Sequence, residues 1–97
     1  MIFKICGIKK IDNLICCEAN NADFFGMIFY EKSPRNINLR EAKELIDFSK
    51  NLKIKPVGVF VNHIITDLKD IITSLNLKYI QLHGDETQSY INEVKNT

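Results

Sequence analysis

Four times along this 97-residue chain, a short apolar run is followed by a segment in which apolar residues recur at helical spacing. The apolar runs are residues 2–6, 24–29, 57–61 and 79–82. Runs that are apolar on both faces are typical of strands covered on both sides of a parallel sheet, and parallel neighbours need a crossover, usually a helix. The pattern therefore predicts an α/β fold, a parallel (βα)4 arrangement. Right-handed crossovers would bring all four strand ends to one side.

Polar residues mark where the helices begin. Asn38 is followed three residues later by Glu41, the spacing of a capping box, which predicts a helix start at this point. By the same reasoning, Asn62 is expected to cap the third helix, and Asp85 with Gln88 to begin the last one. No linker or low-complexity segment interrupts residues 1–97, so we expect one continuous segment.

Composition narrows the class of partner. Thirteen Lys and Arg residues against twelve Asp and Glu give a net charge of +1. The basic residues form no patch of the kind that binds nucleic acid, so nucleic-acid binding is not expected. No apolar run approaches the length of a membrane span, and three cysteines without framework spacing favour a reducing compartment. We therefore expect a cytoplasmic protein. The cysteines and histidines lack metal-ligand spacing, and no phosphate-binding glycine fingerprint is present, so neither a metal nor a cofactor is predicted.

Four βα units do not close a barrel. A (βα)8 barrel typically needs about 200–250 residues or more. The first and fourth strands of this chain would be long apolar edges, which isolated proteins seldom tolerate. Either the chain is part of a longer one, or two copies complete each other. We favour the longer chain.

Candidate chemistry lies at the predicted strand ends. Cys6 ends the first strand and shares a face with Lys4, although a free cysteine also packs as a small buried residue. Gln81 and His83 share a face at the end of the fourth strand, where a ligand, a core network or water would satisfy them. Arg35 lies in the loop after the second strand, and its guanidinium suits a carboxylate or a phosphate. An exposed arginine without a ligand is the alternative.

A nucleophilic pair between Cys6 and His83 is a further hypothesis, although the sequence does not place the two in contact.

Four motifs in register resemble one enzyme family, phosphoribosylanthranilate isomerase of tryptophan biosynthesis. The motifs are Lys4-Ile5-Cys6-Gly7-Ile8, Ala22-Asp23 to Gly26-Met27-Ile28-Phe29 with Lys32-Ser33-Pro34-Arg35, Val57-Gly58-Val59-Phe60-Val61-Asn62, and Gln81-Leu82-His83-Gly84-Asp85-Glu86. Their order and spacing match the family from the first residues to about Glu86. The family fold is a TIM (βα)8 barrel, so the resemblance implies that this chain corresponds to its N-terminal half.

The resemblance also implies a reaction and residue roles. The family converts N-(5′-phosphoribosyl)anthranilate into 1-(2-carboxyphenylamino)-1-deoxyribulose 5-phosphate by an Amadori rearrangement, without cofactor or metal. Cys6 would be the general base that removes the C2′ proton, as a thiolate whose formation a positive neighbour favours. Arg35 would bind the anthranilate carboxylate. Gln81 and His83 would line the substrate pocket.

Two parts of the family's site have no counterpart in this chain. The family's general acid is an aspartate at the end of the fifth strand, and its phosphate site follows strands seven and eight. Neither Asp67, Asp70 nor Asp85 lies at such a position, so this segment by itself is expected to be inactive. Asn21 stands where the family often has glycine, and asparagine tolerates the same backbone conformation. The alternatives are a non-catalytic half-barrel that self-associates, and a sugar-phosphate binding domain or an isomerase of another substrate.

Overall fold

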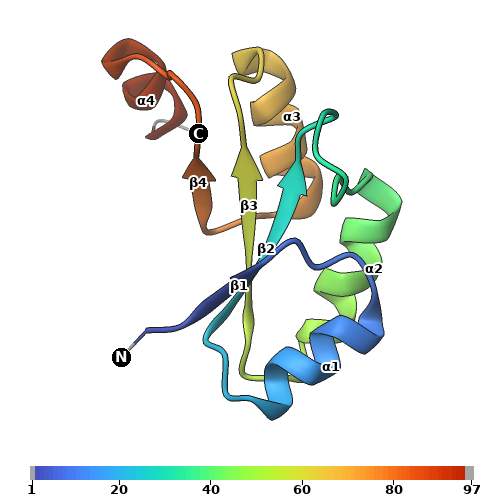
Figure 1. Cartoon of the computed structure of the whole chain (residues 1–97). Helices are drawn as coiled ribbons and strands as arrows, with labels where there is room; N and C mark the ends of the chain where they lie inside the picture. The colour runs from blue at the N-terminus through green and yellow to red at the C-terminus, as the bar shows by residue number, and fades with distance from the viewer. Residues whose placement is uncertain (1, 96–97) are drawn as a thin grey trace.

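Four strands and four helices alternate along residues 2–95, the part of the chain that the computed structural model describes (Figure 1). The order is β1 (Lys4–Cys6), α1 (Ile11–Ala19), β2 (Phe24–Phe29), α2 (Leu39–Ser49), β3 (Lys55–Phe60), α3 (Ile65–Leu75), β4 (Ile80–Leu82) and α4 (Gln88–Lys95). The predicted (βα)4 order is confirmed. 

The strands form one parallel sheet in the order β1-β2-β3-β4. β2 and β3 pair over six residues, from Phe24 opposite Lys55 to Phe29 opposite Phe60. β1 and β4 pair over three residues each at the two edges. Because all strands are parallel, their carboxyl ends and the loops that follow them lie at one end of the sheet.

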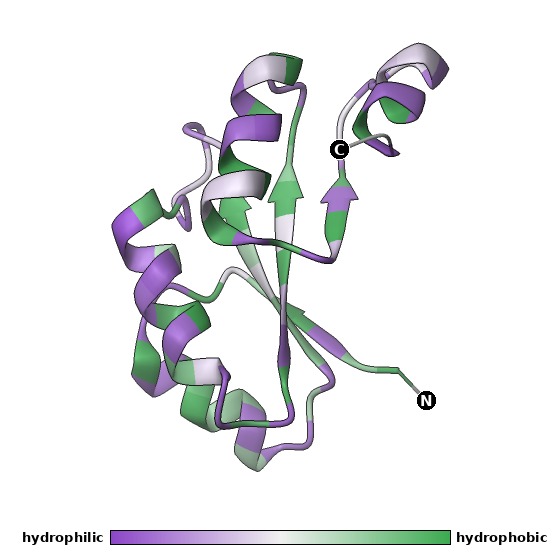
Figure 2. Ribbon diagram, turned by 180° about the vertical axis from the view of Figure 1, so that it is seen from behind, coloured by the Kyte–Doolittle hydropathy of each residue, from purple (hydrophilic) through white to green (hydrophobic). Residues whose placement is uncertain are grey.

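The main core lies between the sheet and the helices. The helices pack in chain order, α1 against α2, α2 against α3 and α3 against α4. Figure 2 shows hydrophobic colour along the two central strands and alternating colours along the helices, as expected when each helix buries one face. Burying each large apolar side chain contributes about 1.5–3 kcal/mol. The largest fully buried side chains are Phe25, Phe60, Leu14, Met27, Leu45, Ile54 and Leu68.

The other face of the sheet is curved inward. Lys4 Nζ on β1 donates a hydrogen bond to Gln81 Oε1 on β4, although these are the two edge strands. In a flat sheet, strands three positions apart are separated by about 14 Å, too far for two side chains that stand perpendicular to it. The sheet therefore curls, and Lys4, Cys6 and Gln81 share its concave face.

The hydrogen bond between Lys4 and Gln81 also shows how far the strands are staggered. Lys4 is in register with Phe24 on β2, whereas Gln81 is in register, through β3, with Ile28. The two side chains thus meet although their levels on β2 differ by four residues. In a closed βα barrel with eight strands and a shear of about 8, each strand is shifted by about one residue relative to its neighbour. Over the three steps from β1 to β4 this gives a shift of about three residues, close to the four residues found here.

The expected helix starts are partly confirmed. Asn38 Oδ1 accepts a hydrogen bond from the Glu41 backbone N–H, and the Glu41 carboxylate accepts one from the Asn38 N–H, so the capping box of α2 is present. The prediction for Asn62 is wrong. Ile64 precedes α3 without a side-chain cap, and Asn62 instead adopts a left-handed conformation with φ 50°.

The last helix begins later than Asp85. The Tyr90 N–H donates to Thr87 Oγ1 at 3.2 Å, so Thr87 satisfies a free N–H at the start of α4. Both edge strands are also shorter than the sequence predicted. Residues 2–3 and 79 lie outside the strands, because the ladders to β2 and β3 begin at Lys4 and Ile80.

Candidate active site

Cys6 is the last residue of β1, and its side chain covers a glycine on the neighbouring strand. Cys6 is in register with Gly26, and a methyl group at Gly26 would lie 2.8 Å from Cys6 Sγ. Only a glycine at this position leaves the thiol its place. The thiol is half-buried on the concave face, at the end of the sheet where the loops gather.

Arg35 packs on the residue that follows Cys6. Gly7 has φ +83°, a conformation that glycine adopts without strain, and its N–H donates to the Gly26 carbonyl at 3.0 Å. A methyl group at Gly7 would lie 2.5 Å from Arg35 Cδ and 2.8 Å from Nη1. The structure therefore places the Arg35 side chain against the residue next to Cys6, at the end of β1, although Arg35 and Cys6 are far apart in sequence.

The loop after β2 holds Arg35 in this position. The Arg35 N–H donates to Ser33 Oγ at 3.1 Å, and the Asn36 N–H donates to the Ser33 carbonyl at 3.1 Å. Asn36 then forms a parallel bridge to Ile28, and the Ile37 N–H donates to the Ile28 carbonyl. The loop thus turns back beside β2 and presents the guanidinium at the strand ends.

Gln81 projects from β4 into the concave face, where Lys4 is its partner. Lys4 and Cys6 share a face of the sheet, as predicted, and the polar side chain of Gln81 lies on that same face. The Lys4 ammonium is a positive charge on the same face as Cys6, the candidate base, and the sequence predicts no role for Lys4. Strand alternation already pointed Lys4 inward, but its partner lies 77 residues away in the chain.

His83 follows β4 and its imidazole is exposed. Its backbone N–H donates to the Phe60 carbonyl at 2.8 Å, which continues the ladder of β3 beyond the strand. Within residues 2–95, no hydrogen bond joins the His83 side chain to Cys6 or to another residue, so a nucleophilic Cys6–His83 pair is not formed. His83 lies at the same end of the sheet as Cys6 and Arg35.

Asn62, which the sequence predicted only as a helix cap, and Glu86 connect the loops after β3 and β4. The Glu86 carboxylate accepts hydrogen bonds from the Asn62 N–H at 2.9 Å and from the Gly84 N–H at 2.8 Å. Asn62 Oδ1 accepts from the Asp85 N–H at 2.8 Å, and a methyl group at Gly84 would lie 2.5 Å from this oxygen. Together these contacts, which we call the Asn62–Glu86 link, fix the segment that carries His83.

These contacts shift the pKa of the Glu86 carboxyl. Partial burial would raise its pKa, but hydrogen bonds from the backbone N–H groups of Asn62, Glu86 and Gly84, with the nearby His63, outweigh that effect. The pKa of Glu86 is therefore lowered from its ordinary value of 4.5. A carboxylate that accepts backbone N–H bonds is stabilised in its charged form.

Residues 2–95 contain no group of three or more His, Cys, Asp or Glu side chains arranged to hold a metal ion. In the same part of the chain, every helix is too short or too polar to span a bilayer.

The fold places the chain in a class. A curved parallel sheet with staggered strands, helices on its convex face and polar side chains at the carboxyl ends of its strands is a segment of a βα-barrel protein, the class in which sites lie at that end.

Comparison with known proteins identifies the family within this class. The family model of N-(5′-phosphoribosyl)anthranilate isomerase matches residues 3–97, and the chain belongs to this family. The isomerase of Caldanaerobacter subterraneus subsp. tengcongensis is 42% identical over 95 residues, which cover 96% of this chain and 45% of that protein. The predicted resemblance is confirmed.

Solved structures agree in fold. The phosphoribosylanthranilate isomerase of Thermotoga maritima superposes with a TM-score of 0.87 at 31% identity, over 99% of this chain and 47% of that one. A family structure in complex with reduced 1-(o-carboxyphenylamino)-1-deoxyribulose 5-phosphate gives the same TM-score at 31% identity, over 99% of this chain and 50% of that one. The predicted half of a TIM barrel is confirmed, and the chain spans about half the length of the relatives it matches.

Proposed function

We propose that this chain supplies the first four βα units of a phosphoribosylanthranilate isomerase barrel, in which N-(5′-phosphoribosyl)anthranilate undergoes its Amadori rearrangement during tryptophan biosynthesis. The observation that carries the proposal is the position of the Arg35 side chain against Gly7, the residue after Cys6, at the end of the sheet where Gln81 and His83 also lie. Family membership adds the reaction. As a biosynthetic enzyme without a membrane-spanning helix in residues 2–95, the protein would act in the cytoplasm.

Each side chain would have a role suited to its chemistry. Cys6 would remove the C2′ proton as the general base, from the last residue of β1. The Arg35 guanidinium would bind the anthranilate carboxylate with two parallel hydrogen bonds. Gln81 and His83 would contact the sugar and the ring. A small-molecule substrate is consistent with the relative that was solved with a reduced product analogue.

The 97-residue chain alone would not turn over substrate. The family's general acid and phosphate site belong to its second half, and removing such groups typically costs about 10²–10⁴-fold in rate for the acid alone. An isomerase assay of the isolated chain should therefore give no turnover above the uncatalysed reaction. Turnover at an ordinary enzymatic rate would contradict this part of the proposal.

A chimaeric protein tests the proposal directly. This chain would replace the matching first half of the Caldanaerobacter isomerase, whose own second half supplies the missing groups. We expect isomerase activity, and we expect Arg35→Lys to raise KM several-fold with a smaller change in kcat, because an ammonium cannot replace a two-pronged contact. Arg40→Lys, on the exposed start of α2, is the matched control. A folded but inactive chimaera, or equal effects of the two substitutions, would refute the proposal.

The open edges favour a second candidate, a half-barrel that self-associates. The outer edges of β1 and β4 have no strand partner within residues 2–95, and Ile2 and Phe3 beside β1 are exposed. One related isomerase, from Thermotoga maritima, is described as dimeric. Light scattering of the isolated chain distinguishes the candidates, since a clean monomer at micromolar concentration excludes self-association through these edges.

A further inference from the structure

A cavity of about 490 Å³ lies at the opposite end of the sheet from the candidate active site. It opens between the C-terminal ends of α2 and α3 and the beginning of β3. Its volume falls in the range of small-molecule sites, about 300–1,000 Å³. Nothing in the proposed reaction uses this end of the sheet, so the cavity is independent of the proposed function.

Positive charge is concentrated around this cavity. Lys43, Lys50, Lys55 and Lys78 line it, and Asp47 is its one acidic lining residue. The whole chain, by contrast, is nearly balanced, with 13 basic and 12 acidic residues. Four ammonium groups around one space repel each other, so the arrangement is stabilised by an anion.

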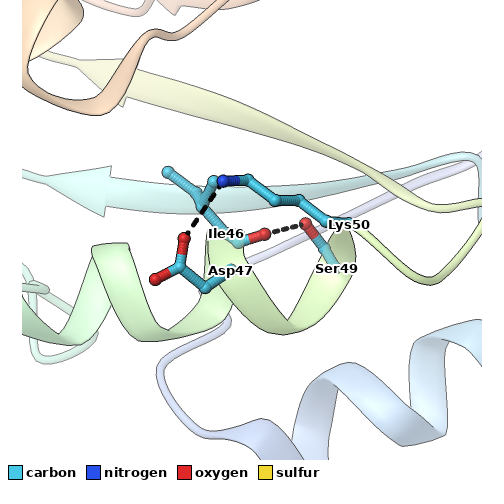
Figure 3. Close-up of polar contacts among 4 residues, drawn as sticks. All are labelled: Ile46, Asp47, Ser49 and Lys50. Carbon is cyan, nitrogen blue, oxygen red and sulfur yellow. Dashed lines mark hydrogen bonds and ion pairs between the residues drawn. The ribbon is translucent and has the colours of Figure 1, made fainter.

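The single acidic residue is already engaged. Figure 3 shows the Lys50 side chain reaching back along α2 to Asp47, with Nζ 3.4 Å from Oδ1. Beside it, the Ser49 hydroxyl donates to the Ile46 carbonyl within the same turn. No ion pair within residues 2–95 involves Lys43, Lys55 or Lys78. Three cations therefore remain uncompensated by side chains.

Helix dipoles explain part of this charge. Lys50 and Lys78 lie at or just after the ends of α2 and α3, where exposed carbonyls favour cations. Each helix end carries roughly half a negative charge, so two ends offset about one of the three free ammonium groups. Lys55, the first residue of β3, is not at a helix end. A net positive charge remains.

The cavity also has an apolar side. Ile46, Leu52 and Ile54 line it, and so does Tyr79, a residue that is 43% exposed. Tyr79 is held edge-on to Phe24, with ring centroids 5.2 Å apart, so one aromatic surface is fixed in place. A flat ring can stack on such a surface while its charged groups reach the lysines.

We propose that this cavity binds a small polyanion joined to an aromatic ring, of the class of nucleoside triphosphates. The phosphate groups would contact Lys43, Lys55 and Lys78, and the ring would lie against Tyr79 and the aliphatic side chains. Because the contacts are largely exposed ion pairs, affinity falls as salt rises.

Calorimetry with the 97-residue chain at low salt tests the proposal, using ATP, inorganic tripolyphosphate and adenosine as probes. We expect saturable one-to-one binding of ATP, weaker binding of tripolyphosphate and none of adenosine. Amide chemical-shift changes should be confined to residues 46–56 and 74–79. Absence of saturable ATP binding, shifts centred on Gly7 or Gly84, or tripolyphosphate or adenosine binding as tightly as ATP would each overturn the proposal.

Exposed lysines allow substitutions that leave the fold intact. Lys55→Gln and Lys78→Gln should each weaken ATP binding about fivefold, the upper range for an exposed ion pair. Tyr79→Leu should weaken ATP binding but not tripolyphosphate binding. Lys95→Gln, exposed at the end of α4, is the matched control. If Lys95→Gln weakens binding as much as the cavity substitutions do, the attraction is general and the proposal is wrong.

Discussion

At the scale of single residues, two glycines decide where two side chains of the candidate site lie. Gly26 leaves room for Cys6 Sγ, and Gly7 combines a positive φ with close contact to Arg35. In the sequence, Gly7 is only a residue that follows a predicted strand and Gly26 only a residue inside one, and neither residue has a reactive group. The candidate base and the candidate carboxylate-binding residue therefore depend on positions that carry no functional group.

Gly7→Ala should destabilise the chain by about 1–2 kcal/mol, the typical cost of placing an ordinary residue in the left-handed region. Its new methyl group would lie 2.5 Å from Arg35 Cδ, and it would therefore also displace the Arg35 side chain. Urea unfolding followed by circular dichroism measures the change. Asn21→Gly, at another positive φ, is the control and should shift stability by no more than about 0.5 kcal/mol. Equal effects would contradict the role given to Gly7.

Glu86→Gln should make stability less dependent on pH. The folded pKa of Glu86 lies below its ordinary value of 4.5, so its carboxylate stabilises the fold above that value. This contribution is lost as the pH falls through the lowered pKa. The wild type should therefore exceed Glu86→Gln in free energy of unfolding at about pH 6, and the difference should shrink toward about pH 3. A constant difference, or an equal effect of Glu31→Gln in an exposed loop, would contradict this assignment.

At the scale of elements, the helices differ in how they begin. α2 has a complete capping box, whereas α3 starts after Ile64, which is 70% exposed and supplies no side-chain cap. The stability of α3 therefore depends on packing through Leu68 and Leu75 rather than on its first turn. A substitution can therefore remove the cap of α2, and another can add a cap to α3.

Asn38→Ala should cost about 0.5–2 kcal/mol, because the Glu41 N–H loses its partner. Ile64→Asp should stabilise by about 0.5–1 kcal/mol, since the new carboxylate can accept an N–H of the first turn and interacts favourably with the helix N-terminus. Differential scanning calorimetry of both variants measures the shifts. Unchanged stability in Asn38→Ala would show that the capping box contributes nothing.

Local pattern was enough to predict the order of elements, since alternating periodicity and the Asn38–Glu41 spacing are contained in neighbouring residues. It failed where the deciding partner is distant. Asn62 can cap a helix or adopt a left-handed turn, and the choice is made by Glu86, 24 residues away. The length of the edge strands likewise depends on where β2 and β3 offer partners. The same limit hid the contact between Lys4 and Gln81.

At the scale of the whole molecule, the curl of the sheet is the feature that connects fold and function. The hydrogen bond between Lys4 and Gln81 joins the two edge strands across the concave face and reproduces the stagger of a closed barrel. Residues from β1, from the loop after β2 and from β4 therefore face one space. In the proposed function, the chain would provide one side of a barrel site, and the family's remaining groups would complete it.

The kcat of the chimaeric isomerase with and without the Cys6 thiol tests the central claim most directly. Cys6→Ser keeps the size of the side chain but removes the readily ionised group, so kcat should fall by about 10²–10⁴-fold, the usual contribution of a general base. Cys16→Ser, on the exposed side of α1, should leave kcat unchanged. A Cys6→Ser chimaera that folds and keeps more than about a tenth of the parent kcat would show that Cys6 is not the base.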